Sequence, residues 1–225
     1  ARNTRYDLLN RYCKKNKVKI LLTAHNLEDQ VETFLIRLSR GSGLKGLSAM
    51  KPLRKLNTHV SLYRPLLDIK KKFLIKIAKQ TFGTFFKDPS NVDEKYLRTK
   101  VRNLKKPLEK SGIKYEQIFR SIQNLSLSKS TLEEYLNNIS KKLIIKTKGK
   151  VLINYNKYKK LSKDTKMVLI NESIKKLKNN YYDLRSKKVN NLIINLERRE
   201  FKKTSLGGCI FFKKGENLCL KVEKL

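Results

Sequence analysis

The sequence is poor in acidic residues, cysteine, proline and tryptophan. It has no tryptophan, four prolines, three cysteines, and 19 acidic residues against 54 lysines and arginines. Cys13, Cys209 and Cys219 are far apart and form no CxxC pair, which argues against a disulfide framework and against a zinc site. No apolar run approaches the roughly twenty residues of a membrane-spanning helix. We therefore expect a cytoplasmic protein that does not bind a membrane and keeps its thiols reduced.

What the chain has in abundance is positive charge. Its 225 residues carry a formal net charge of +35. A surplus of this size concerns partners and solubility rather than fold. It favours a nucleic-acid partner, and the alternative is a lysine-rich composition that raises the charge without serving a ligand.

The first part of the chain has the pattern of an α/β protein. Residues 18–22 are a short apolar run typical of a buried strand, and the apolar stripe of residues 27–38 predicts an amphipathic helix. Asn26 and Asp29 have the spacing of a capping box at the start of this helix. An Arg-Gly-Ser-Gly loop then stops it. This order predicts a phosphate or nucleotide site at the carboxyl end of a parallel strand.

The rest of the pattern predicts further helices, a hairpin and C-terminal strands. Asp68 is expected to cap a helix that Gly83 ends, and the turn 148–150 is expected to close a hairpin. We expect residues 1–108 to form the α/β domain and residues 109–225 a mostly helical domain with small β pieces. Helices are expected over residues 2–14, 68–82, from about 93, and over 115–141, 163–178 and 184–198, with strands in 58–66 and 204–222.

A first group of residues has the chemistry of a binding site. His25 follows the strand, and Asp29 lies in the first turn of the helix, where a carboxylate suits a magnesium ion or a substrate amine. His25 is equally well explained by a bond to a local carbonyl, and Asp29 by the preference of helix starts for acids. Arg37 adds positive charge, and the glycine loop after it can bring backbone N–H groups to an anion. The loop residues are Arg40, Gly41, Ser42 and Gly43.

A second group lies in the segment KDPSNVDEKYLRTKVRN, residues 87–103. Arg98 and Arg102 are four residues apart, so they share a helix face and can hold phosphate together. Tyr96 offers a flat ring for an unpaired base. The alternative interpretation is a turn followed by a solvated basic helix. The candidate RNA-binding residues are Asp88, Ser90, Asn91, Tyr96, Arg98 and Arg102.

Taken together, these motifs resemble one family. The segments LLTAHNLEDQVETFLIRLSRGSGLKGLSAM, RPLLDI, KDPSNVDEKYLRTKVRN and TSLGGCIFF occur in the same order in tRNA(Ile)-lysidine synthases, which are PP-loop ATP pyrophosphatases. The resemblance is strong over residues 1–103 and weaker from there to the end. It implies a Rossmann-like parallel sheet of the adenine-nucleotide α-hydrolase type. We expect this sheet to be incomplete at its N-terminal side, because the family's Ser-Gly-Gly-x-Asp-Ser phosphate loop is not in the sequence.

The resemblance also implies a reaction. The family joins free lysine to the wobble cytidine of the isoleucine tRNA with a CAU anticodon. ATP adenylates the cytidine, and the lysine amine then displaces AMP. The implied cofactors are ATP and Mg²⁺, with a homodimer left open. His25, Asp29 and Arg37 would act in catalysis, the loop 40–43 on the nucleotide and the segment 88–102 on the tRNA, with Asp29 as the candidate magnesium ligand. Residues 1–108 would be a partial PP-loop catalytic domain, and residues 109–225 a helical substrate- and tRNA-binding domain with C-terminal β strands.

The sequence departs from the family's usual residues at three positions. Glu28 and Thr99 are conservative replacements of Asp and Asn, whereas Lys87 reverses the usual charge. A PP-loop tRNA thiolase is disfavoured, because such enzymes commonly use CxxC pairs. The remaining alternative is a tRNA-binding protein that has kept the basic surface and lost the ATP chemistry.

Overall fold

The computed structural model describes residues 2–86, 93–178, 184, 186–198, 201 and 203–223. The chain divides into two compact units, residues 1–130 (unit 1) and residues 131–225 (unit 2), and the division falls within helix α7 (Tyr115–Leu143). The sequence-based domain boundary after residue 108 stays a prediction. Among the described residues, no helix has the length and apolarity needed to cross a bilayer.

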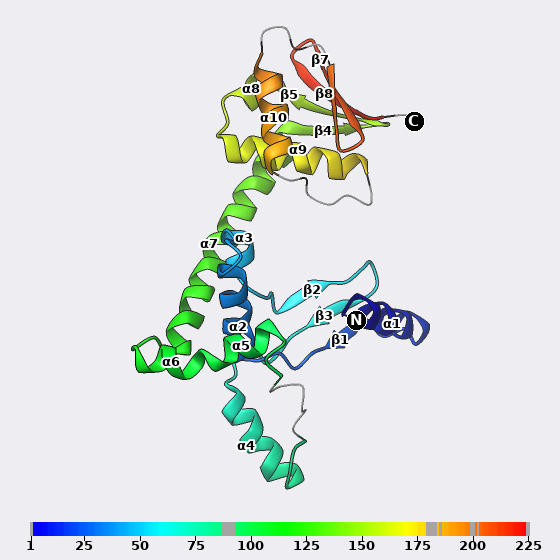
Figure 1. Ribbon diagram of the computed structural model, residues 1–225. Helices are drawn as coiled ribbons and strands as arrows, with labels where there is room; N and C mark the ends of the chain where they lie inside the picture. Colours follow the sequence, from blue (N-terminus) through cyan, green and yellow to red (C-terminus); the bar gives the residue numbers. More distant parts are fainter. Residues whose placement is uncertain are drawn as a thin grey trace. The chain divides into compact units, whose positions relative to one another are not determined.

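Unit 1 contains a three-stranded mixed sheet with the order β1-β3-β2 (Figure 1). Strand β1 (Ile20–Leu22) pairs in parallel with β3 (Ser61–Tyr63), and β2 (Leu53–Lys55) pairs antiparallel to β3. The parallel pair agrees with the α/β prediction. Strand β2 was not predicted, because its three residues lack an apolar alternation, and all three are exposed.

Unit 1 has a small hydrophobic core between α2 (Leu27–Leu38) and α7. Leu27 and Val31 pack with Ala49 and with Tyr115 and Ile122 of α7. The helices of unit 1 before α7 are α1 (Arg2–Lys15), α2 (Leu27–Leu38), α3 (Leu44–Leu47), α4 (Lys71–Phe82), α5 (Leu97–Asn103) and α6 (Lys105–Lys110).

The start of α4 corrects one prediction. The helix begins at Lys71 after the N-cap Lys70, so Asp68 does not cap it. The Ile69 N–H closes a turn onto the Leu66 carbonyl at 3.0 Å, which keeps this segment out of the helix. The carboxylate of Glu28 instead accepts the Lys71 N–H at 2.8 Å, so an acid from α2 stabilises the positive end of α4.

Unit 2 is built on one five-stranded antiparallel sheet with the order β4-β5-β8-β7-β6. The predicted hairpin is confirmed, because Thr147 of β4 pairs with Lys150 of β5 around Gly149, whose φ is +72°. The elements after α7 are β4 (Ile144–Thr147), β5 (Lys150–Asn154), α8 (Tyr155–Lys159), α9 (Lys163–Leu177), α10 (Ser186–Glu197), β6 (Lys203–Leu206), β7 (Cys209–Lys214) and β8 (Asn217–Val222).

Helices α8, α9 and α10 cover one face of this sheet (Figure 1). The side chains between helices and sheet form the larger core of the protein, in which Val151, Ile153, Phe211, Leu218 and Leu220 are fully buried. Alternate strand residues must point to the other face. That face, which none of these three helices contacts in the core, is called the open sheet face below.

Candidate phosphate-binding site in unit 1

The site is organised by the first turn of α2, at the carboxyl end of β1. The predicted capping box is confirmed: the Asn26 side chain accepts the Asp29 N–H at 3.1 Å, and the Asp29 carboxylate accepts the Asn26 N–H at 3.0 Å. The next free N–H, that of Leu27, donates to the Ile69 carbonyl at 3.1 Å. These bonds fix where the helix begins, and so fix the direction of the side chains that follow.

A cavity of about 270 Å³ opens beside this turn. Three predicted residues, His25, Arg37 and Arg98, line it together, although Arg98 comes from the second group. This volume is at the small end of ligand pockets, which suits phosphate groups better than a whole nucleotide. Its described lining residues include three arginines and one histidine, and none of them is a carboxylate. The described lining residues are Arg5, Tyr6, Leu9, Thr23, His25, Thr33, Arg37, Met50 and Arg98.

His25 is held by the strand that it follows. Its Nδ1 atom lies 3.0 Å from the hydroxyl of Thr23, and the Thr23 N–H donates to the Tyr63 carbonyl at 3.0 Å, which extends the β1–β3 pairing by one residue. One ring nitrogen therefore has a local hydroxyl partner, rather than the carbonyl considered from the sequence. The ring lines the cavity, and this position allows contact with an anion.

Arg37 braces the loop that follows α2. Its Nη1 atom donates to the carbonyls of Gly46 and Ala49 at 2.7 and 2.9 Å. Gln30, nearly two helical turns earlier, donates to the Met50 carbonyl at 2.9 Å and accepts the Met50 N–H at 2.8 Å. The loop is thus fastened to α2 at its returning end, and Arg37 brings positive charge to the wall of the cavity.

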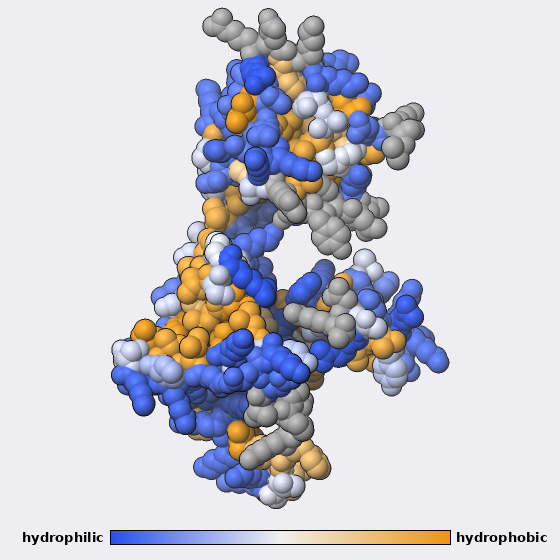
Figure 2. Space-filling model, viewed as in Figure 1, coloured by the Kyte–Doolittle hydropathy of each residue, from blue (hydrophilic) through white to orange (hydrophobic). Residues whose placement is uncertain are grey.

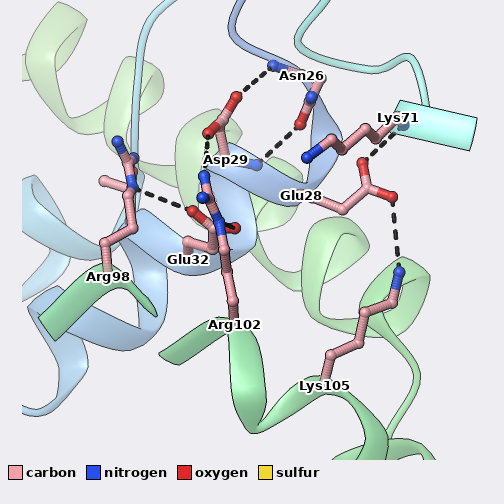
Figure 3. A network of polar contacts seen from close by, with 9 residues as sticks. Asn26, Glu28, Asp29, Glu32, Lys71, Arg98, Arg102 and Lys105 are labelled. Carbon is pink, nitrogen blue, oxygen red and sulfur yellow. Dashed lines mark hydrogen bonds and ion pairs between the residues drawn. The ribbon is translucent and has the colours of Figure 1, made fainter. Parts of the chain in front are cut away.

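Helix α5 joins the site through a buried carboxylate that sequence analysis did not select. Glu32 is only 3% exposed and faces both arginines of α5 (Figure 3). Arg102 Nε donates to one of its oxygens at 2.6 Å, and Arg98 Nε lies 3.0 Å from the other as an ion pair without an aligned hydrogen bond. Arg98 also donates to the Thr33 hydroxyl at 3.2 Å. The Glu32 carboxylate therefore holds both guanidinium groups in position.

Burial of the Glu32 carboxylate disfavours its charged form. Burial raises the pKa of Glu32 above its ordinary value, and the nearby Asp29 acts in the same direction. The hydrogen bond and charge of Arg102, with the charge of Arg98, lower the pKa but do not outweigh burial. A buried ion pair of this kind contributes little net stability, and its effect is to fix the position of its partners.

The other two acids at the start of α2, Glu28 and Asp29, also lie near basic side chains. Asp29 Oδ1 lies 3.8 Å from Arg102 Nη2, and Glu28 Oε1 lies 3.6 Å from Lys105 Nζ (Figure 3). No group of three His, Cys, Asp or Glu residues suited to a metal occurs among the described residues. The donor set around Asp29 is thus a backbone N–H and an arginine, which does not fit a magnesium ion, and we derive no step through this metal.

Other predicted residues lie outside the cavity. Arg40 and the loop 41–43 are not among the described residues that line it. Two N–H groups of that loop close the end of α2 instead: Gly41 donates to the Leu38 carbonyl at 2.9 Å and Ser42 to the Arg37 carbonyl at 3.1 Å. Tyr96 is 59% exposed, as a stacking role requires. Asp88, Ser90 and Asn91 lie outside the described residues.

Comparison with known proteins finds one matching family model. A family model described as the PP-loop domain matches residues 1–108. The α/β class predicted from the sequence is confirmed.

The chain is similar in sequence to tRNA(Ile)-lysidine synthases, as its motifs predict. It is 34% identical over 226 residues to the tRNA(Ile)-lysidine synthase of Wolbachia pipientis wMel, covering 98% of this chain and 51% of the relative. The enzyme of that name from Anaplasma marginale is 38% identical over 138 residues, covering 61% of this chain and 29% of the relative. The chain thus spans about half the length, or less, of these curated relatives.

One solved structure was also compared. The U34-tRNA thiolase NcsA from Methanococcus maripaludis superposes with a TM-score of 0.43 at 24% identity, covering 55% of this chain and 41% of that chain. A likeness at this level supports no conclusion about function.

Proposed function

We propose that this chain is part of an enzyme that joins free lysine to the wobble cytidine of the CAU-anticodon isoleucine tRNA at the expense of ATP. The names of the relatives support the reaction class. The observation that carries the proposal is the basic cavity at the carboxyl end of β1, where His25, Arg37 and Arg98 come together from separate segments.

Such a cavity suits the first half of the reaction. Attack of the cytidine carbonyl oxygen on the α-phosphorus of ATP forms one P–O bond and breaks another, releasing pyrophosphate. Negative charge grows on the phosphate oxygens as this happens, and fixed cations in a partly buried site stabilise it. We assign this role to His25, Arg37 and Arg98, which Thr23, the loop carbonyls and Glu32 hold in place.

The second half of the reaction needs a carboxylate near the attacking amine. We propose that Asp29 attracts the lysine ammonium group, because it lies next to the cavity residues on α2 and is partly exposed. The amine must lose a proton before it attacks. Exposed Tyr96 would stack on the tRNA, with Arg102 as a positioning residue held by Glu32.

The proposal is tested by incubating the protein, as the cell makes it, with ATP, labelled lysine and the CAU-anticodon isoleucine tRNA. Label should enter the tRNA only when ATP is present. A protein that binds the tRNA normally and incorporates no lysine would instead be the non-catalytic tRNA-binding member considered from the sequence.

The two histidines of the chain give a matched pair of variants. His25→Gln should lower lysine incorporation by about a hundredfold, a typical cost of losing one group that stabilises developing charge. His59→Gln is the control, because His59 is exposed and lines a different cavity. Equal activity of the two variants would remove His25 from the reaction.

Asp29→Asn separates catalysis from folding. The asparagine oxygen can still accept the Asn26 N–H, so the helix start survives, whereas the attraction for an ammonium group is lost. Lysine incorporation should fall steeply, with unchanged tRNA affinity. Loss of tRNA binding together with activity would mean that Asp29 acts only in structure, through Arg102.

A further inference from the structure

The open sheet face of unit 2 carries a row of apolar side chains across four strands. Each member of the row is the register partner of the next one, from strand β4 through β5 and β8 to β7. The row consists of Ile145, Leu152, Cys219 and Phe212. Ile145 is 61% exposed, and Cys219 is absent from the core cluster that faces the helices. The strand alternation therefore brings these side chains to the side away from α9 and α10.

Lysines surround this row. Lys203 pairs with Phe212 at the β6 edge, and Lys214 lies at the end of β7 on the same face. Lys221 Nζ lies 6.0 Å from the centre of the Phe212 ring, which confirms that both side chains share the face. Figure 2 shows how widely hydrophilic residues cover the viewed surface of this unit. The strand residues described on the open sheet face are uncharged or lysine.

Two of these lysines stand directly opposite each other. Lys150 of β5 and Lys221 of β8 are register partners in neighbouring strands, and both are exposed. Their Cβ atoms are therefore about 5 Å apart, a distance at which like charges destabilise a sheet. Among the described residues, no acid forms an ion pair with either. Such a pair is relieved when an anion binds between the two ammonium groups.

We propose that the open sheet face binds RNA, with Lys150 and Lys221 contacting phosphate groups and Phe212 stacking on an unpaired base. The charge of the face favours RNA over an acidic protein, since the flat apolar row between lysines matches bases between phosphates. This proposal deepens the proposed function by giving the tRNA a contact surface outside unit 1, and it rests on that function for the identity of the RNA.

The lysines are tested with a matched pair of double variants in the full chain. Lys150→Gln/Lys221→Gln removes two charges from the open sheet face, and Lys187→Gln/Lys188→Gln removes two exposed charges from α10, on the covered side. Binding of a labelled RNA hairpin with an unpaired loop is followed by fluorescence anisotropy over a salt series. The first variant should bind about five- to tenfold more weakly and lose about one to two units of salt slope. The α10 variant should change affinity less than twofold.

The stacking contact is tested with Phe212→Leu, which keeps an apolar side chain. Affinity for the loop-bearing hairpin should fall about threefold or more, because aromatic stacking is lost. Affinity for a fully paired RNA duplex should not change. Equal losses for the two RNAs would overturn the stacking role.

Other outcomes would overturn the proposal as a whole. Equal effects of the two lysine variants would mean that only total charge matters. Binding of the wild type, but not the sheet variant, to phosphatidylserine vesicles without any RNA effect would assign the face to a membrane. Self-association abolished by the sheet variant would assign it to a second copy. In each case, lysine incorporation by the His25→Gln variant tests the proposed function independently of the open sheet face.

Discussion

In unit 1 the arginines of α5 face carboxylates on α2, whereas in unit 2 the lysines of the open sheet face have other lysines or uncharged residues as register partners. The first arrangement fixes single cations at defined points around a small cavity. The second spreads charge over a flat surface by strand register alone. The same excess of positive charge can therefore serve precise positioning in one unit and broad attraction in the other.

The two units also differ in their cores. Unit 2 buries a large continuous cluster between its sheet and helices, while the buried cluster around Leu27 and Val31 of unit 1 is small. A small cluster relaxes more easily when a side chain is shortened. The following predictions use matched substitutions in the two units to test these differences.

The largest effect is expected from leucine deletions in the two cores. Leu220→Ala should lower the free energy of unfolding of unit 2 by about 3–4 kcal/mol, because Leu220 is fully buried on a central strand. Leu27→Ala should cost unit 1 about 2 kcal/mol. Urea unfolding with hydrogen exchange resolved by residue measures both. Equal losses of protection in both units after either change would show that the units unfold as one.

A smaller effect is expected from the helix caps. Asn26→Ala removes the side-chain acceptor at the start of α2, and Ser162→Ala removes the one at the start of α9, which accepts the Thr165 N–H at 3.3 Å. Each should cost about 1 kcal/mol. Only Asn26→Ala should also lower lysine incorporation, because only that cap orients the cavity residues. Reduced activity in both variants would count against a special role for the α2 cap.

The buried carboxylate predicts a pH dependence. Because the pKa of Glu32 is raised in the folded protein, protonation favours the fold. Its contribution to stability is complete below its unfolded pKa and is lost as the pH rises through its folded pKa. The unfolding free energy of wild type minus that of Glu32→Gln should therefore decrease as the pH rises above the ordinary glutamate range.

The matching change in unit 2 is Glu197→Gln. Glu197 accepts a bond from Lys166 at 2.8 Å, but its side chain is 45% exposed. Its charge is well solvated, so this variant should not show the same trend. A Glu32→Gln difference that grows with pH would mean that the arginines outweigh burial.

The smallest effect comes from the facing lysines. Lys150→Gln should raise the free energy of unfolding of unit 2 by a few tenths of a kcal/mol, about 0.2–0.5, because it removes a like-charge pair across strands. Lys187→Gln on α10 should leave it unchanged. Thermal unfolding at low salt is the appropriate measurement, and equal values for the two variants would show that the repulsion is already screened.

Local signals predicted local structure well. The capping box at Asn26 and Asp29 and the hairpin around Gly149 are confirmed, since each depends on neighbouring residues. The start of α4 at Lys71 was missed, because its stabilising acid, Glu28, is 43 positions away in the chain. Local patterns contain no information about such partners.

The candidate site shows the same limit. His25 and Arg37 were identified from motif order, and Arg98 from helical spacing. Glu32 was not selected from the sequence, although it is the residue that holds Arg98 and Arg102. Only the packing of α5 against α2, which is set by contacts remote in sequence, distinguishes a buried carboxylate from an exposed one.

The attachment of the loop after α2 has a consequence for how this region can vary. Arg37 and Gln30 fasten the returning end of the loop through Gly46, Ala49 and Met50. The stretch between the end of α2 and Gly46 is therefore held at both of its ends. One extra residue at Gly43 should therefore leave folding intact while displacing the glycines of the loop. Such an insertion would separate the requirements of stability from those of catalysis within a single loop.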